Sequence, residues 1–252
     1  MRALLALLLV LAAPLPAAAE RLVSKVSRDE VAITSSYTGE TLTLFGSIEP
    51  ETGSTAKFVE GPFHIIITVT GPTADRVTRQ KSSVFGIWLN TAEAEFAHFP
   101  TLYQVRSDAK LSDITDPVTL AKYRIPLISQ AYATSKAGWW NTIAFSHETV
   151  RLMEKSGRMK LNEQGVVFHS DTFYSAQAVV PADAVPGLYI AHTYLFKNGL
   201  LIAEKSDGFT VRKIGFERFL GQAAQEQPLL YGLVCVMLAL FTGWLGGVVF
   251  KR

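Results

Sequence analysis

The feature that most constrains this chain is an apolar segment near its C-terminus. Residues 228–250 contain no charged side chain, and the basic pair Lys251-Arg252 follows directly. A helix of this length crosses about 30 Å of hydrocarbon with some tilt, and glycines like those in this segment are common in membrane-spanning helices. We therefore expect a transmembrane helix at 228–250 and a cytoplasmic tail at 251–252. The alternative is a buried helix of a soluble domain.

The N-terminus indicates export. Met1-Arg2 precedes an apolar run of about eleven residues, which is too short to span a bilayer as a helix. Ala17 and Ala19 fit the A-x-A site of signal peptidase. No cysteine lies near this cleavage site, so the segment does not have the pattern of a lipoprotein signal. We expect residues 1–19 to be a signal peptide, the alternative being a retained anchor. Both ends then predict a single-pass protein of the bacterial inner (cytoplasmic) membrane with its N-terminal ectodomain in the periplasm.

The ectodomain carries almost no net charge. The chain has a formal charge of +2 from 24 basic and 22 acidic residues, and removing Arg2, Lys251 and Arg252 from the count leaves 21 basic residues. Such a balance does not attract phosphate backbones, which argues against nucleic acid as a partner. The only cysteine, Cys235, lies in the apolar segment, so the ectodomain has no disulfide although its compartment permits one.

Residues 20–213 have the pattern of a mainly β ectodomain. Residues 63–70 alternate between two faces and are rich in β-branched side chains, which predicts a strand. The pair Asn198-Gly199 is the strongest hairpin signal in the chain. We expect an exposed strand at 76–81 and a buried one at 84–90. Further strands are expected at 31–34, 41–48, 99–105, 166–168, 173–179, 185–196, 200–204 and 209–211.

The middle of the ectodomain has a helical pattern instead. Asp116-Pro117 fits an N-cap followed by the first helical position, and predicts a short helix to about Arg124. A longer helix fits 138–155 and would end at Gly157. Its core-facing stripe at helical spacing is Trp140, Ile143, His147, Val150 and Glu154, with Ala144 beside it.

Short strands, turn residues and the opening Pro186-Gly187-Leu188-Tyr189 are typical of an immunoglobulin-like β-sandwich. The helices at about 112–157 would be an insertion between its two halves, and 214–227 a membrane-proximal helix. The Cys…Trp…Cys signature of antibody domains is missing from the sequence. Two small β domains are the alternative to one sandwich.

A set of short motifs also runs along the chain in a fixed order. They are Ser35-Ser36-Tyr37-Thr38-Gly39, Gly86-Ile87-Trp88-Leu89-Asn90 after Arg79-Gln80-Lys81, Pro100 with Tyr103, Val185-Pro186-Gly187-Leu188-Tyr189, and the C-terminal span. Together they resemble a family of alphaproteobacterial transmembrane proteins over nearly the whole mature chain. The resemblance implies a membrane protein often linked by gene neighbourhood to sulfite-exporter-type membrane proteins. It implies no catalytic residues.

No motif indicates an enzyme. There is no Gly-x-Ser-x-Gly nucleophile elbow, and the side chains of the neighbours Ser146 and His147 would point apart on a helix. No His-x-His or His-x-x-x-His spacing occurs, so structural histidines are favoured over a copper site using Met153 or Met159. We expect no catalytic residue, no cofactor and no bound metal. The five histidines are His64, His98, His147, His169 and His192.

Tryptophans and small residues predict the contact surfaces. Trp88 is expected in the core with Ile87 and Leu89, whereas Trp139, about 100° around its helix from Trp140, is the candidate partner surface. In the span, small residues recur every three or four positions, which lets helix backbones approach closely in lipid. We expect these positions to pack against another helix, a passive anchor being the alternative. They are Gly232, Cys235, Ala239, Gly243 and Gly247.

These features together predict a non-enzymatic accessory subunit of a membrane transporter. The ectodomain would bind a partner in the periplasm. The span would lie in the lipid bilayer against a polytopic, exporter-like membrane protein or against a second copy in a homodimer. The alternative is a periplasmic metal- or small-ligand-binding module anchored to the membrane.

Overall fold

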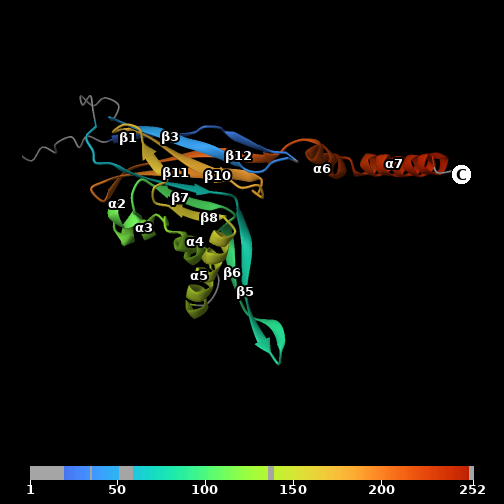
Figure 1. Cartoon of the computed structure of the whole chain (residues 1–252), viewed down its shortest axis with the longest axis horizontal. Coiled ribbons are helices and arrows are strands. Elements are labelled where there is room, and N and C mark those ends of the chain that lie inside the picture. The colour runs from blue at the N-terminus through green and yellow to red at the C-terminus, as the bar shows by residue number, and fades with distance from the viewer. Residues whose placement is uncertain (1–19, 35, 51–58, 136–138, 250–252) are drawn as a thin grey trace, which may run out of the picture.

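The computed structural model describes residues 20–34, 36–50, 59–135 and 139–249, and their architecture is mainly β (Figure 1). The expected signal peptide (1–19) and tail (251–252) lie outside the described residues, as does Phe250. The strands form a four-stranded sheet, a six-stranded sheet and a two-stranded ribbon. The prediction of a mainly β fold is therefore confirmed.

The four-stranded sheet is antiparallel throughout, with the strand order β1-β3-β10-β9. These strands are β1 (Glu20–Val26), β3 (Glu40–Pro50), β10 (Phe173–Val180) and β9 (Val166–Phe168). Burial alternates along β3 and β10, which is typical of an antiparallel sheet with one face packed on a core. Gly46 lies on the buried face, where an added Cβ would meet the Val23 carbonyl of β1 and the Tyr174 ring of β10.

The six-stranded sheet has the order β2-β12-β11-β4-β7-β8. Its centre is antiparallel, and its two edge strands, β2 and β8, pair in parallel with their neighbours. Asn198 and Gly199, at φ 51° and 81°, form the turn between β11 and β12, which confirms the predicted hairpin. The strands are β2 (Glu30–Ile33), β12 (Leu200–Lys213), β11 (Gly187–Lys197), β4 (His64–Thr70), β7 (Tyr103–Ser107) and β8 (Met159–Asn162).

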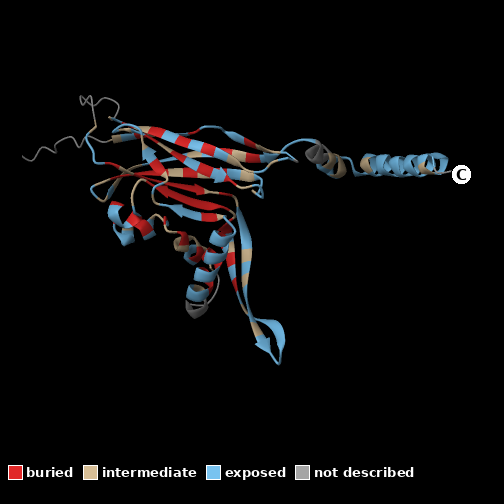
Figure 2. Ribbon diagram, viewed as in Figure 1, coloured by how far each residue is buried: buried red, intermediate tan, exposed pale blue. Residues whose placement is uncertain are grey.

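The six-stranded sheet is buried on both faces (Figure 2). On β4, Ile65 and Ile67 belong to the core between the two sheets, whereas Ile66 belongs to a second core beneath the helices. Full burial of one such side chain contributes about 1.5–3 kcal/mol. The helices are α2 (Leu111–Ile114), α3 (Pro117–Lys122), α4 (Leu127–Thr134) and α5 (Trp139–Lys155).

A carboxylate fixes the start of β4. Oδ1 of Asp108 accepts the Ile65 backbone N–H at 2.7 Å, and its Oδ2 lies 2.7 Å from Nδ1 of His64. Asp108 follows β7 directly, so these two bonds join the ends of two neighbouring strands.

The predicted helix starts are correct, but the predicted inner face of α5 is wrong. Asp116 caps α3 by accepting the N–H groups of Val118 and Thr119. On α5, Ile143, His147 and Glu154 are exposed, and of the predicted stripe's described side chains only Val150 is buried. The face that packs inward is Phe145, Ser146, Thr149, Val150 and Met153.

Thr149, a polar member of that inner face, explains part of the error. The Thr149 hydroxyl donates to the Phe145 carbonyl at 2.7 Å and lies 2.7 Å from the Thr78 hydroxyl of β5 (Thr73–Val84). A threonine that satisfies its hydroxyl in this way can face a core, and hydropathy periodicity does not detect it.

Two helices end the described chain. α6 (Phe216–Glu226) joins the sandwich to α7 (Pro228–Val249). With a mean hydropathy of 2.1, α7 is the one helix of the described residues that is long and apolar enough to cross a membrane. Figure 2 shows it exposed along its length, clear of the body. This is the helix predicted at 228–250.

Candidate partner-binding surface

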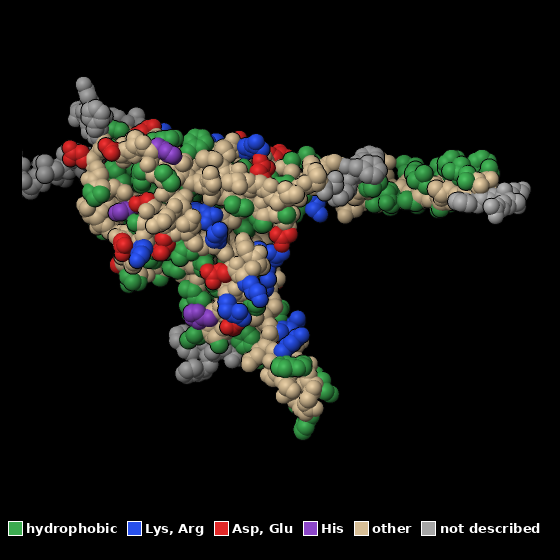
Figure 3. Space-filling model, in the orientation of Figure 1, with side chains coloured by type: hydrophobic (Ala, Val, Ile, Leu, Met, Phe, Trp, Pro, Cys, Tyr) green, Lys and Arg blue, Asp and Glu red, His purple; other side chains and the backbone are tan. Residues whose placement is uncertain are grey.

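The strands β5 and β6 (Ile87–Pro100) form a ribbon that projects from the body (Figures 1 and 3). No residue from 73 to 93 is buried, and only the root of the ribbon, at Ala94, Phe96 and Phe99, enters the second core. Figure 3 shows hydrophobic side chains gathered at its far end, beyond basic side chains on its stem. We call this end the ribbon tip. It consists of Val84, Phe85, Ile87, Trp88 and Leu89, all of them exposed.

The prediction that Trp88 lies in the core with Ile87 and Leu89 is therefore wrong, as is the buried strand expected at 84–90. Trp88 is 70 % exposed, and the segment is the end of a hairpin. Cross-strand pairing of Val84 with Ile87 and of Ser83 with Trp88 puts the tryptophan on the opposite face from Val84 and Ile87. The tip therefore presents apolar surface on both faces.

The turn at the tip has an unusual residue. Phe85 and Gly86 adopt φ 52° and 80°, the left-handed pair of a two-residue hairpin turn. Glycine takes this conformation freely, but a bulky side chain at positive φ is strained by about 1–3 kcal/mol. Because Phe85 is fully exposed, its ring gains no burial within this chain to offset that strain. Strain without an internal benefit is typical of functional positions.

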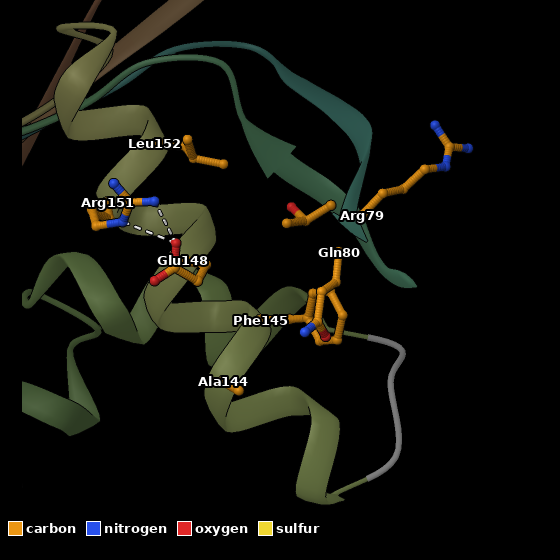
Figure 4. A pocket seen from close by; sticks show the side chains of 8 residues that line it. Arg79, Gln80, Ala144, Phe145, Glu148, Arg151 and Leu152 are labelled. Carbon is orange, nitrogen blue, oxygen red and sulfur yellow. Dashed lines mark hydrogen bonds and ion pairs between the residues drawn. The ribbon is translucent and has the colours of Figure 1, made fainter. Parts of the chain in front are cut away.

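A cavity of about 420 Å³ lies where the ribbon meets α5 (Figure 4). Thr78, Arg79 and Gln80 line it from β5, opposite Phe145 and Leu152 of α5. Its charged groups are already paired with one another or with the ribbon. Glu148 accepts two bonds from Arg151, which holds the pKa of the Glu148 carboxyl below its usual value, and Arg79 pairs with Glu93 at 3.1 Å. The charged side chains that line the cavity are therefore all in ion pairs.

The small residues of the span all lie on α7, on a helix that is not buried against the rest of the described chain. A Cβ added at Gly232, Gly243 or Gly247 would have no neighbour within 4 Å, and Cys235 is exposed. Ala239 is likewise exposed. The described chain thus leaves this helix face open.

Comparison with known families gives one match. Residues 21–252 match the family described as "Putative transmembrane protein (Alph_Pro_TM)", so the match includes both the ribbon tip and α7. The chain belongs to this family. It is a membrane protein with one candidate C-terminal span. The search of curated proteins found no match.

Four of the five histidines of this family member have separate side-chain partners, and His98 donates its backbone N–H to Asp75. His64 pairs with Asp108, His147 with Tyr132, His169 with Ser175 and His192 with Ser206. No three His, Cys, Asp or Glu side chains of the described residues cluster in a way that could hold a metal ion. Met153 and Met159, considered for copper, are buried in the second core. Ser146 is buried whereas His147 is exposed, so the two side chains lie on different faces of α5.

The candidate Trp139 begins α5, but its side chain lies outside what the structure describes. The tip residues were missed because 84–90 was interpreted as one strand. Gly86 within that apolar pattern is the signal that could have identified a turn.

One histidine gives a pH-dependent prediction. Burial lowers the pKa of His192 from its ordinary 6.5, an effect that Glu204 partly opposes. As pH falls below 6.5, the unfolded chain binds the proton before the folded one does, so acid lowers the free energy of unfolding. We expect the melting temperature to fall less between pH 7.5 and 5.5 in His192→Gln than in the wild type. Equal decreases in both proteins would contradict this.

Proposed function

We propose that this protein is a single-pass accessory subunit of a transporter in the bacterial inner membrane, and that its periplasmic ectodomain binds the transporter through the ribbon tip. The observation that supports this most directly is the tip itself. Soluble domains rarely expose contiguous apolar side chains, and such patches are typical of interaction sites. Tryptophan and phenylalanine, both present here, are enriched in the cores of protein interfaces.

The direction of the ribbon favours a protein partner over the lipid surface. In Figure 1 the ribbon extends across the long axis of the molecule, whereas α7 extends along it. With α7 crossing the bilayer, the ribbon runs beside the membrane and does not point into it. A partner anchored in the same membrane, with parts in the periplasm, suits this direction. The family resemblance adds an exporter-type membrane protein as the partner.

The sandwich would serve as the platform for the ribbon. Its strand orders, β1-β3-β10-β9 and β12-β11-β4, correspond to the ABED and GFC sheets of immunoglobulin-like domains. We infer that the ectodomain is of this class, with the ribbon and helices inserted between the strands that correspond to C and D. Domains of this class commonly carry binding residues on loops held by a rigid sandwich.

The span supplies a second contact in this proposal. The open small-residue face of α7 allows a neighbouring helix to approach closely. Orientation with the ectodomain in the periplasm follows from the signal-like N-terminus and the basic tail.

Co-purification of full-length variants from native membranes tests the proposal. Wild-type protein solubilised in a mild detergent is expected to bring down a polytopic membrane protein. Replacing Phe85 and Trp88 by serine should reduce its recovery at least about tenfold, since loss of an interface aromatic costs about 2 kcal/mol or more. Leu200→Ser is the matched control. Leu200 is as exposed as Trp88, at 70 %, and lies beside the hairpin turn at Asn198-Gly199. Its replacement should leave recovery of the partner unchanged.

The variant Gly243→Leu with Gly247→Leu measures the span separately and should also weaken recovery. Recovery of a monomeric wild-type protein without a partner would refute the proposal. So would equal recovery in the wild type, the tip variant and the span variant. If no protein partner is recovered, and the tip variant binds lipid vesicles less than the wild type does, the tip would instead be assigned to the membrane surface.

A further inference from the structure

A second cavity lies at one edge of the sandwich, away from the ribbon. Its volume is about 540 Å³, within the range of small-ligand sites. Residues of β7, β8, β9 and β10 line it, with the loops around β9. The described residues that line it include Arg106, Lys160, His169 and several neutral polar side chains, but no aspartate or glutamate.

Arg106 is the unusual member of this lining. It is only 4 % exposed. Tyr103 and Val105, its neighbours on β7, face the second core, so Gln104 and Arg106 face the opposite way, toward β10. The Arg106 guanidinium donates from Nε to the Gln177 carbonyl at 2.9 Å and from Nη2 to Oε1 of Gln104 at 3.0 Å. Both acceptors are neutral.

Part of this arrangement has a structural explanation. β9 pairs with β10 only as far as Ala176, which leaves the edge of β10 beyond it without a strand partner. Gln104 closes this edge by donating to the Val179 carbonyl at 2.7 Å and accepting the Val179 N–H at 3.3 Å. Arg106 continues the closure at Gln177. A neutral glutamine could do the same, so edge closure does not require a charge at position 106.

The charge of Arg106 is not balanced within the described chain. Its Nη1 is buried and has no hydrogen-bond partner among the described residues. Burial lowers the pKa of the Arg106 guanidinium from its ordinary value. A buried charge that lacks a counter-charge is destabilising by several kcal/mol. An anion in the adjoining cavity would supply that counter-charge through charge-assisted hydrogen bonds.

Two further groups face the same space. Lys160 on β8 is exposed and forms no ion pair with the described residues. Nε2 of His169 lies 2.7 Å from the Ser175 hydroxyl, so a ring nitrogen and a hydroxyl are placed together in the lining. Two cationic side chains, Arg106 and Lys160, and the His169–Ser175 pair thus line a cavity without acidic residues.

We propose that this cavity binds a small oxyanion, with Arg106 as the buried counter-charge and Lys160 at the entrance. A compact anion fits better than a polyanion, because the cavity is small and lies in an ectodomain whose net charge is close to zero. Sulfate, phosphate and small carboxylates share the planar or tetrahedral oxygen pattern that a guanidinium recognises. This site is independent of the ribbon tip and of the transporter proposal.

Titration calorimetry of the full-length protein in detergent tests the site. The probes are inorganic sulfate, inorganic phosphate and succinate, each at an ionic strength held constant with sodium chloride. We expect saturable binding of at least one probe, weakened about two- to fivefold in Lys160→Gln, because an ion pair to an exposed lysine is screened by solvent. Arg106→Gln, which retains the edge closure, should abolish binding.

Lys205→Gln is the matched control, because it removes an exposed lysine of β12 that does not line the cavity. It should bind as the wild type does. Sulfate stabilises proteins generally by exclusion from their surface, so binding is judged by saturation and by its loss in the variants. Because Lys160 is exposed, Lys160→Gln keeps the test valid even if Arg106→Gln fails to fold. Absence of saturable binding to all three probes, or equal binding in Lys160→Gln and the wild type, would overturn the proposal.

Discussion

Phe96→Ala is expected to lower the free energy of unfolding by about 3–5 kcal/mol, the range for removing a fully buried phenylalanine ring. Phe96 has no exposed surface, and its ring packs edge-on against Phe99 with centroids 5.8 Å apart. It belongs to the second core together with residues of β4, β7 and the helices. The ring is also the anchor of the ribbon root, so its loss should release the ribbon before the sandwich unfolds.

Thermal unfolding of the full-length protein in detergent, followed by near-ultraviolet circular dichroism, measures the loss of stability. Hydrogen exchange along β5 and β6 measures the release of the ribbon. Phe85→Ala is the matched control, since it removes the same ring from the exposed end of the same ribbon. Its effect on stability should lie within about 0.5 kcal/mol. Similar effects of the two variants would show that Phe96 does not anchor the ribbon.

Gly46→Ala is expected to destabilise the four-stranded sheet by about 3 kcal/mol, at the upper end of overpacking effects. The new methyl group would collide on one side with the backbone of β1 and on the other with the Tyr174 ring of β10. A backbone carbonyl cannot turn away as a flexible side chain can, so β1 or β3 has to shift. The melting temperature should fall by about 6–12 °C, given about 2–4 °C per kcal/mol for a domain of this size.

Gly208→Ala is the control for that substitution. Gly208 also lies in a strand, β12, but a Cβ there would have its nearest neighbours at 3.4 and 3.5 Å, which is ordinary contact. We expect little change in melting temperature. A Gly46→Ala protein as stable as Gly208→Ala would show that β1 and β3 separate at little cost.

The sequence predicted the elements better than it predicted their surroundings. Asn198-Gly199 specified its hairpin by local backbone preference, and Asp116-Pro117 specified its helix start by local capping. Both signals act within a few residues. Trp88 shows the limit of such local signals. An apolar residue in a strand gives the same sequence pattern whether it is buried in the core of its own chain or exposed to a partner. Whether the ribbon bends back onto the body depends on distant packing, which the pattern does not contain.

The candidate sites were harder to predict for related reasons. Gln104 and Arg106 lie in and beside the strand expected at 99–105, yet their burial depends on where β9 stops pairing with β10. No local pattern predicts that end point. The small residues of the span were identified from spacing alone, and the prediction that they pack against another helix remains a prediction.

The double burial of β4 has a consequence for strand alignment. Ile65, Ile66 and Ile67 follow one another, so sliding β4 by one residue would still place isoleucine in both cores. Sliding would, however, turn Phe63 and Val69 out of the core between the sheets and turn Thr68 into it, so hydrophobicity still favours the observed pairing, but by less than in a strand with one buried face. The Asp108 carboxylate adds a second selection, because it recognises one particular N–H and one particular imidazole. A single polar residue at the end of the sheet thus sharpens an alignment that burial on both faces would otherwise specify less strictly.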